Sequence, residues 1–321
     1  MSKTYRVGTR GSALALTQTR QIIGWLRERR PRLSFEIVEI VTHGDRFQST
    51  PIAQMGAAVE SGIFNSGLEE ALLERRVELA TCSFKDVESA LAEGLRAVPV
   101  GRREDPRDVL LSRHGRGLEG LPPGAVLATS SPRRTSQLLA LRPDLRFQPL
   151  RGNITTRVER DVLRFDGVVL AAAGLLRLGL QGHITEWFDP ARVMPAPAQG
   201  VLGCEYAAER EDVAALVESL RDAPTAQAAL AEKALLVRLS GGCYAPLGVL
   251  GEVQGESLRL RARACSRDGQ RVAEGGAEGP AAEWRKLVES LAVKLEAQGA
   301  QEIVAETRAA LLASGGVRSE P

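Results

Sequence analysis

The chain has little histidine and little cysteine for its length. Only three histidines and four cysteines occur among 321 residues. With so few imidazoles, neither a metal cluster nor a histidine-based catalytic triad is favoured. The cysteines show no C-x-x-C spacing, so free thiols are expected for Cys82, Cys204, Cys243 and Cys265. We therefore predict no metal site and no disulfide framework.

The sequence also lacks long apolar segments and an excess of charge of either sign. Residues 1–10 have no apolar signal-peptide core, and no stretch approaches the roughly 18 apolar residues of a membrane span. Lys and Arg number 42 against 40 Asp and Glu, so the formal net charge is +2. A near-neutral chain has no global field for nucleic acid or a membrane surface. We expect a cytoplasmic protein that binds neither, and any anion site has to be local.

Strand-like and helix-like segments alternate over about the first 220 residues. Such alternation is typical of open α/β sheets with helices on both faces, and it occurs here in two sets. Two similar lobes with a cleft between them are therefore expected. The predicted strands are 6–9, 34–41, 77–82, 126–129, 146–150 and 168–171, and the predicted helices are 13–29, 63–75, 132–140 and 154–164.

After residue 222 the pattern changes to that of a smaller α+β domain. A helix at 226–238 precedes three strands, and two helices follow them. The strands are expected at 247–253, 258–264 and 271–273, and the last helices at 281–296 and 300–313. The polar end of the chain, 314–321, is predicted to be frayed.

Cations follow the ends of several predicted strands. These turns read T-R-G-S at 9–12, S-F-K-D at 83–86, T-S-S-P-R-R at 129–134 and R-G-N-I-T-T-R at 151–157. In open parallel sheets, ligands bind outside the carboxyl ends of the strands. Guanidinium groups bind carboxylates in a bidentate fork, so several spread arginines suit an extended polycarboxylate better than one compact phosphate. No Walker A or dinucleotide-binding glycine motif is present.

The turn at 129–134 is the most informative of the four. Ser131 is a good N-cap and Pro132 a good first residue, so a helix begins there. Arg133 and Arg134 then occupy the first turn, where the helix dipole disfavours cations by ~0.3–1 kcal/mol each. An anion bound between them explains this choice, and solvated surface arginines are the alternative. Substitution of either by leucine is expected to impair ligand handling and to leave the fold intact.

Asp86 and Cys243 each allow two interpretations, one with a role in the chemistry and one without. Asp86 is the only carboxylate in the four turns. It either stabilises a developing cation and moves protons, or forms an exposed pair with Lys85. Cys243 follows two glycines in a loop between a helix and a strand. Its thiol either projects from this loop or packs as a small buried apolar group.

Read in order, eight motifs of the chain resemble those of the porphobilinogen deaminase (hydroxymethylbilane synthase) family. They run from residue 9 to about 250: T-R-G-S-A-L-A-L, S-F-K-D-V, R-R-E-D-P-R-D, T-S-S-P-R-R, L-R-G-N-I-T-T-R, A-A-A-G-L-L-R-L-G-L, P-A-P-A-Q-G and L-S-G-G-C-Y-A-P. The resemblance implies two mixed α/β lobes like those of periplasmic binding proteins and a smaller α+β C-terminal domain. The implied division is 1–100 with 200–221, 101–199, and 222–313, with 314–321 as a disordered tail.

The resemblance also implies an activity. Members of the family are transferases of tetrapyrrole biosynthesis that condense four porphobilinogen molecules, with release of ammonia, into linear hydroxymethylbilane. The chain grows on a dipyrromethane cofactor held by a thioether, here on Cys243, and Asp86 matches the catalytic acid. Cofactor and substrate carboxylates would be bound by Arg10, Ser12, Ser83, Lys85, Thr129, Ser131, Arg133, Arg134, Arg151, Asn153, Arg157, Arg177 and Gln199. A monomer is expected.

The chain departs from the family pattern at two places. Gln54 stands where a lysine is usual, and 56–62 lengthens the lid segment expected there. Cys82 stands where a histidine is common, and its role is left open between reactivity and packing. The alternatives are a non-catalytic two-lobed binding protein for an acidic small molecule and an inactive relative.

Overall fold

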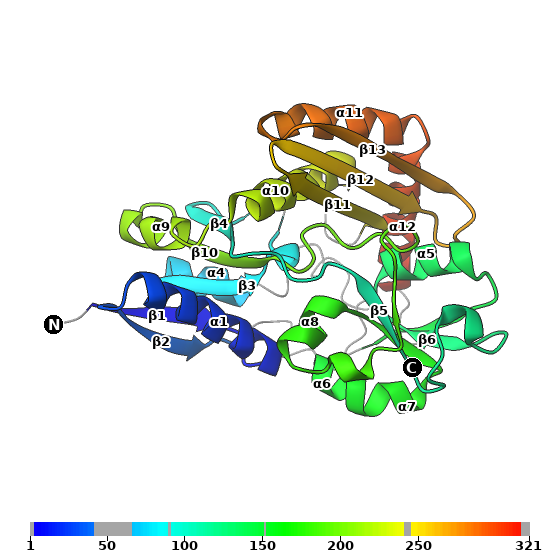
Figure 1. The fold of residues 1–321 in the computed structure, drawn as a ribbon, viewed down its shortest axis with the longest axis horizontal. Coiled ribbons are helices and arrows are strands. Elements are labelled where there is room, and N and C mark those ends of the chain that lie inside the picture. Colours follow the sequence, from blue (N-terminus) through cyan, green and yellow to red (C-terminus); the bar gives the residue numbers. More distant parts are fainter. Residues whose placement is uncertain (1–2, 42–65, 89–90, 151, 241–244, 316–321) are drawn as a thin grey trace.

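The computed structural model describes residues 3–41, 66–88, 91–150, 152–240 and 245–315. Its strands form two five-stranded sheets and one three-stranded sheet. Figure 1 shows three bodies: a lobe that carries the N-terminus, a second lobe beside it, and a smaller sheet with its helices at the top of the view. The predicted lid at 54–62, together with Arg151 and Cys243, lies outside the described residues.

The first lobe is a mixed sheet in the order β2-β1-β3-β10-β4. β1 runs parallel to β2 and β3, whereas β10 lies antiparallel between β3 and β4. α1 buries Ile22, Ile23 and Leu26 against this sheet, at the spacing of an amphipathic helix. The elements are β1 (Thr4–Thr9), α1 (Ala13–Arg29), β2 (Ser34–Glu39), α4 (Ser66–Leu73), β3 (Leu79–Ser83), β4 (Leu95–Val100), β10 (Leu202–Ala207) and α9 (Glu211–Glu218).

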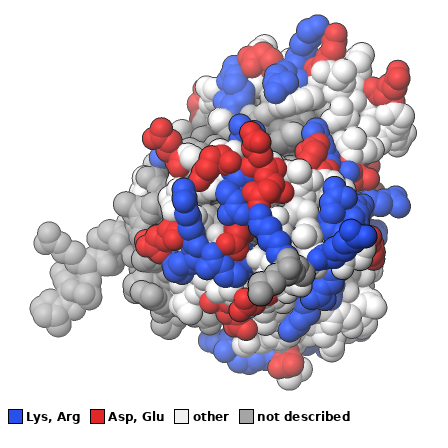
Figure 2. All heavy atoms as spheres, turned by 90° about the vertical axis from the view of Figure 1, so that its left-hand side faces the viewer, with Lys and Arg blue, Asp and Glu red and all other residues white. Residues whose placement is uncertain are grey.

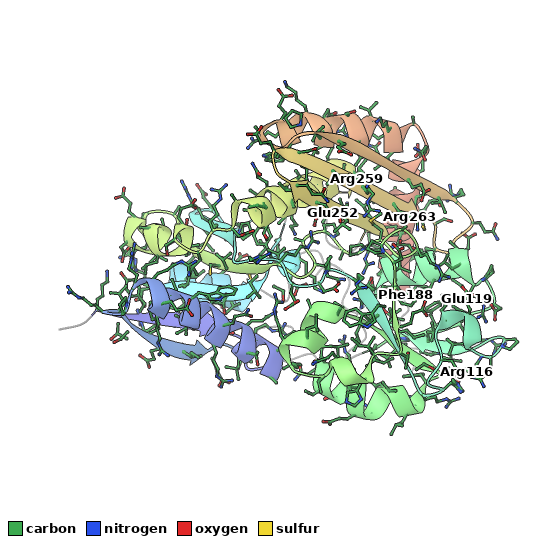
Figure 3. The ribbon with its side chains drawn as sticks, viewed as in Figure 1. Arg116, Glu119, Phe188, Glu252, Arg259 and Arg263 are labelled. Carbon is green, nitrogen blue, oxygen red and sulfur yellow. The ribbon has the colours of Figure 1, made fainter. Side chains whose placement is uncertain are left out.

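The second lobe is a mixed sheet in the order β7-β6-β8-β5-β9. β6 is parallel to both its neighbours, and β5 is antiparallel to both of its own. Phe188, labelled in Figure 3, is buried in a core cluster of this lobe with Leu110 and Leu138. The elements are β5 (Asp108–Ser112), β6 (Val126–Ala128), α5 (Pro132–Leu141), β7 (Arg146–Gln148), α6 (Ile154–Thr156), a π-helical turn (Arg157–Asp161), α7 (Val162–Arg164), β8 (Gly167–Ala171), α8 (Ala172–Arg177) and β9 (Glu186–Trp187).

The C-terminal body is an antiparallel sheet, β11-β12-β13, with helices packed on its apolar face. Arg263 of β12 points from this sheet toward the second lobe (Figure 3) and donates to the carbonyls of Ala191 (2.8 Å) and Arg192 (2.7 Å). The elements are α10 (Ala223–Ser240), β11 (Leu247–Gln254), β12 (Ser257–Cys265), β13 (Val272–Pro280), α11 (Trp284–Glu296) and α12 (Ala300–Gly315).

The predicted fold class, two mixed α/β lobes with a smaller α+β domain, is confirmed. Four strands, β4, β5, β9 and β10, are additions that the periodicity does not predict. β5 and β10 are buried at every position, so they lack the alternation by which a half-buried strand is recognised. The predicted helix at 154–164 is interrupted by the π-turn at 157–161.

Two segments connect the lobes and lie side by side. The N–H of Glu104 donates to the Gly200 carbonyl (3.1 Å), and Arg103 Nε donates to the Gln199 carbonyl (2.8 Å). Gly200 has φ +88°, and a Cβ there would lie 2.3 Å from the Glu104 oxygen, so only glycine fits. Arg103 also pairs at 2.5 Å with Glu232, a fully buried carboxylate of α10. The two connecting segments are therefore joined to the C-terminal domain through Arg103 and Glu232.

Within the described residues, no helix is long and apolar enough to cross a membrane. Figure 2 shows cationic and anionic side chains interspersed over one face of the molecule. This distribution agrees with the near-neutral net charge.

Candidate active site

The turn that carries Asp86 leaves the carboxyl end of β3. A 3-10 turn, Phe84–Asp86, follows the strand directly. Phe84 anchors it, since its side chain is buried and its N–H donates to the Val201 carbonyl (2.9 Å). Asp86 itself is exposed. Its carboxylate is thus presented where ligands bind in sheets of this kind.

Lys85 begins a polar chain that runs from the first lobe to the second. Its Nζ donates to Gln199 Oε1 (3.4 Å), and Gln199 Nε2 donates in turn to Asp108 Oδ1 (2.9 Å). Gln199 is fully buried. Burial lowers the pKa of Lys85, and the charge of Asp86 opposes that shift. Lys85 and Gln199, both predicted site residues, are therefore in contact.

Asp108 forms ion pairs with Arg133 and Arg134, which lie in the first turn of α5. Arg133 Nη1 lies 2.7 Å from Asp108 Oδ2, and Arg134 Nη2 lies 2.7 Å from Asp108 Oδ1. All three side chains are buried. Burial alone would raise the pKa of Asp108, but the two guanidinium charges outweigh it and hold that pKa well below its usual range.

This geometry corrects two inferences drawn from the sequence. An anion does lie between Arg133 and Arg134, but it is the carboxylate of Asp108, which enters from β5. The expectation that a leucine substitution leaves the fold intact is also wrong in its physical premise. Removing either cation leaves buried charge uncompensated, which costs about 3–5 kcal/mol for a buried pair.

Asp108→Asn is expected to lower the free energy of unfolding by about 3–5 kcal/mol at pH 7, because both arginines lose their counter-charge. Urea unfolding measures this difference. Asp144→Asn, at the exposed pair with Arg142, is the control and should change stability far less. Because the folded-state pKa of Asp108 is depressed, its contribution is present above about pH 4 and declines as the pH falls further. The difference in free energy of unfolding between wild type and Asp108→Asn should therefore become smaller in acid. A difference that stays constant with pH would contradict this account.

The hydroxyl groups of the predicted set lie at helix starts and strand ends. Ser12 caps α1 by accepting from the Ala15 N–H (3.3 Å), and Ser131 caps α5 by accepting from the Arg134 N–H (3.4 Å). Ser83 accepts from Gln18 Nε2 (3.0 Å). Thr129 Oγ1 accepts from the Ser131 N–H (3.3 Å). These bonds fix the turns on which the cationic residues stand.

Arg177, at the end of α8, is a cation with spare hydrogen-bonding capacity. One of its nitrogens, Nη2, donates to the Gly200 carbonyl (2.8 Å). Its Nε is buried and has no hydrogen-bond partner among the residues that the structure describes. Burial lowers the pKa of Arg177 to about 10, with the charge of Glu104 opposing. A ligand carboxylate would supply both the missing acceptor and a counter-charge.

Asn153 and Arg157 lie on the short helical stretch that follows residue 152. Asn153 occupies the N-cap position of α6, and Arg157 is the first residue of the π-turn. π-turns inside helices are frequent at functional sites. Arg10 follows β1 and is partly exposed at the end of that strand.

The structure places Cys82 among packed residues. The thiol is buried and donates to Glu205 Oε1 (3.5 Å) on the neighbouring β10. Burial raises the pKa of Cys82 well above its ordinary value, and Glu205 adds to the shift. A protonated, enclosed thiol is a poor nucleophile. Packing therefore accounts for Cys82, and reactivity does not.

Sequence reasoning missed Asp108, Glu205 and Glu232, all fully buried carboxylates. They stand on strands or a helix and not in the turns, which is why a search of turns does not find them. A signal for Asp108 was present, since it ends the motif R-R-E-D-P-R-D.

Two family models match this chain. That described as porphobilinogen deaminase, dipyromethane cofactor binding domain, matches residues 5–215, and that described as porphobilinogen deaminase, C-terminal domain, matches residues 226–297. The chain belongs to the porphobilinogen deaminase family. The first family model spans both lobes and both connecting segments, and the second covers α10 to α11.

Two relatives by sequence agree with this membership. The chain is 46% identical over 310 residues to a porphobilinogen deaminase of Desulforudis audaxviator, covering 96% of this chain and 99% of that protein. It is 43% identical over 305 residues to one of Thermus thermophilus, covering 94% and 98%. Among solved structures, lipoprotein Tp32 of Treponema pallidum aligns with a TM-score of 0.44 and 14% identity, over 70% of this chain and 92% of that one.

Proposed function

We propose that this chain is a porphobilinogen deaminase, which condenses four porphobilinogen molecules with release of ammonia into linear hydroxymethylbilane. The observation that carries the proposal is Arg177, a largely buried cation with an unpartnered Nε in the described part of the chain. A ligand carboxylate would supply the acceptor that this Nε lacks, and the family's pyrroles carry acetate and propionate groups. The membership of the chain in this family of tetrapyrrole-forming transferases supports the same conclusion.

The residues present fit the dipyrromethane cofactor of the family model. When bound, this group supplies the free pyrrole α-carbon on which the product chain is built. We propose that Cys243 holds it by a thioether and that the chain's cations and hydroxyls bind its carboxylates. The proposed binding set is Arg10, Ser12, Ser83, Lys85, Thr129, Ser131, Arg133, Arg134, Arg151, Asn153, Arg157, Arg177 and Gln199.

The members of this set differ in what they can offer. Arg177 has a buried donor without an acceptor among the described residues, so it is suited to direct contact with a ligand. Arg133 and Arg134 give hydrogen bonds to Asp108, and Gln199 joins that carboxylate to Lys85. The two arginines thus compensate a buried carboxylate within the second lobe, and the contact between Gln199 and Lys85 links this group to the first lobe. Only the remaining donors of the arginines can face a ligand.

Asp86 is proposed to carry the chemistry. Loss of ammonia from porphobilinogen and attack by the next pyrrole both pass through positive charge on a pyrrole ring. An exposed carboxylate at the end of β3 can stabilise that charge and accept or return a proton. The cations of the neighbouring turns are proposed to bind the substrate's acidic groups.

The decisive experiment is incubation of the purified protein with porphobilinogen. A deaminase consumes the substrate, releases ammonia and yields a product that cyclises spontaneously to uroporphyrin, which absorbs visible light. A two-lobed binding protein would instead retain porphobilinogen unchanged, as seen by calorimetry with no loss of substrate. Binding without turnover would replace the proposal by that alternative or by an inactive relative.

Three further properties belong to the proposal. We place the domain boundaries at 1–100 with 200–221, 101–199 and 222–313, supported by the presence of β10 in the first sheet. A cytoplasmic location and a monomeric state are proposed from the sequence features described above. Light scattering on the purified protein measures the oligomeric state directly.

A further inference from the structure

The long helix of the C-terminal domain reaches the turn that carries Asp86. Lys233 of α10 is only 8% exposed. Its Nζ donates to the carbonyl of Val87 at 2.5 Å and lies 3.4 Å from the carbonyl of Lys85. A single ammonium group therefore contacts the main chain on both sides of Asp86.

Backbone hydrogen bonds among the described residues also hold this turn. A three-residue 3-10 turn cannot pair its last carbonyls internally. Its backbone bonds run from the Phe84 N–H to Val201 and from the Val87 N–H to Phe84. The first bond holds the start of the turn and the second closes it, and Lys233 adds a donor to the carbonyls of Lys85 and Val87. Asp86 is exposed, and the main chain of the turn sets the region in which its carboxylate can lie.

The neighbouring residue on α10 anchors the helix at this place. Glu232 accepts from the N–H groups of Ala198 (2.5 Å) and Gly251 (2.6 Å), in addition to its pair with Arg103. Glu232 thus joins α10 to both connecting segments and to β11. Figure 1 shows α10 between the first lobe and the C-terminal sheet. Lys233 is therefore held firmly enough to position the turn.

We propose that Lys233 is a positioning residue for Asp86, by which the C-terminal domain sets the geometry of the catalytic turn. The inference rests on the proposed function, since it takes Asp86 to act on the substrate. Without the ammonium group, the Val87 and Lys85 carbonyls lose their shared donor and the carboxylate samples more positions. Proton transfer then slows, whereas substrate affinity, which the arginines provide, changes little.

A purely structural role is the competing explanation. Glu88 is half-buried near Lys233; burial and Glu69 raise the pKa of Glu88, and Lys233 opposes that rise. If Lys233 served only as a partner for this carboxylate, its loss would lower stability without lowering turnover per folded molecule. Glu88→Gln separates the two roles because it removes the carboxylate and leaves the contacts to the main chain.

The test compares Lys233→Met with Lys233→Arg, Glu88→Gln and Arg238→Met. Arg238 lies on the same helix, but its ion pairs, with Glu289 and Glu296, are within the C-terminal domain. With the covalent cofactor verified by mass, Lys233→Met should lower kcat about 10- to 100-fold at nearly unchanged KM. Lys233→Arg should recover most of this loss, and both control variants should keep the wild-type kcat.

A second readout does not depend on turnover. Hydrogen–deuterium exchange of the peptide spanning 84–88 should accelerate in Lys233→Met and not in Arg238→Met. Wild-type kcat and exchange in a folded Lys233→Met protein would overturn the inference, and so would equal losses in Lys233→Met and Glu88→Gln. If Lys233→Met does not fold, Lys233→Gln is judged by the same criteria. Absence of product with the wild-type protein would instead refute the proposed function, so the two failures are distinguishable.

Discussion

Asp86→Asn should keep the covalent cofactor and lose nearly all turnover. Asparagine has almost the same shape as aspartate, but it carries no charge and cannot accept the proton. General acid–base catalysis contributes about 10²- to 10⁴-fold, so a loss in kcat of that order is expected. The measurement is the rate of uroporphyrin formation from porphobilinogen, with the cofactor mass confirmed beforehand.

Glu93→Gln is the matched control for this substitution. Glu93 is an exposed carboxylate of the same lobe, seven residues further along the chain, so the change in net charge is identical. It should leave kcat unaltered. Comparable activity in wild type and Asp86→Asn would remove Asp86 from the mechanism, whatever its position in the turn.

Cys243→Ser should abolish the covalent cofactor. A serine hydroxyl is a much weaker nucleophile than a thiolate and forms no thioether, so the primer has nowhere to attach. Intact-protein mass spectrometry should show the dipyrromethane increment on the wild-type protein and the bare polypeptide mass on the variant. Turnover should fall to background in the same sample.

Cys265→Ser is the control here, because Cys265 is a buried thiol of the same C-terminal domain. Burial raises the pKa of Cys265 to about 11, so it stays protonated at neutral pH. This variant should retain the full mass increment. An increment that persists in Cys243→Ser would place the attachment elsewhere, and an unmodified wild type made in normal cells would contradict covalent anchoring altogether.

The helices with clear caps were predictable from local chemistry alone. The predicted bounds of α1, 13–29, are those observed, since Ser12 accepts from the Ala15 N–H as an N-cap should. α5 begins at Pro132 behind Ser131 for the same reason. Two strands that are buried at four of their five positions, β3 and β8, were predicted as well. β5 and β10 are buried at every position and were not predicted, because a strand without alternation has to be inferred from a short apolar run alone.

The residues of the candidate site also fall into those that local sequence could predict and those that it could not. The cationic turns were recognisable because ligand sites in open sheets lie at strand ends, and those residues are contiguous in sequence. Their partners were not recognisable. Asp108 contacts Arg133 and Arg134 at sequence separations of 25 and 26 residues, and Lys233 contacts Val87 at a separation of 146. No local pattern encodes a contact at such separation.

The sequence alone therefore determined the fold class, the family and the residue types of the site, because periodicity, capping and ordered motifs are local properties. Only the tertiary structure decided which cationic side chains pair with the protein's own carboxylates and which have donors left for a ligand. Arg133 and Arg134 compensate a buried carboxylate, whereas Arg177 keeps a buried donor without an acceptor among the described residues. Burial and pairing are set by which strands and helices meet, and that is decided when the whole chain folds.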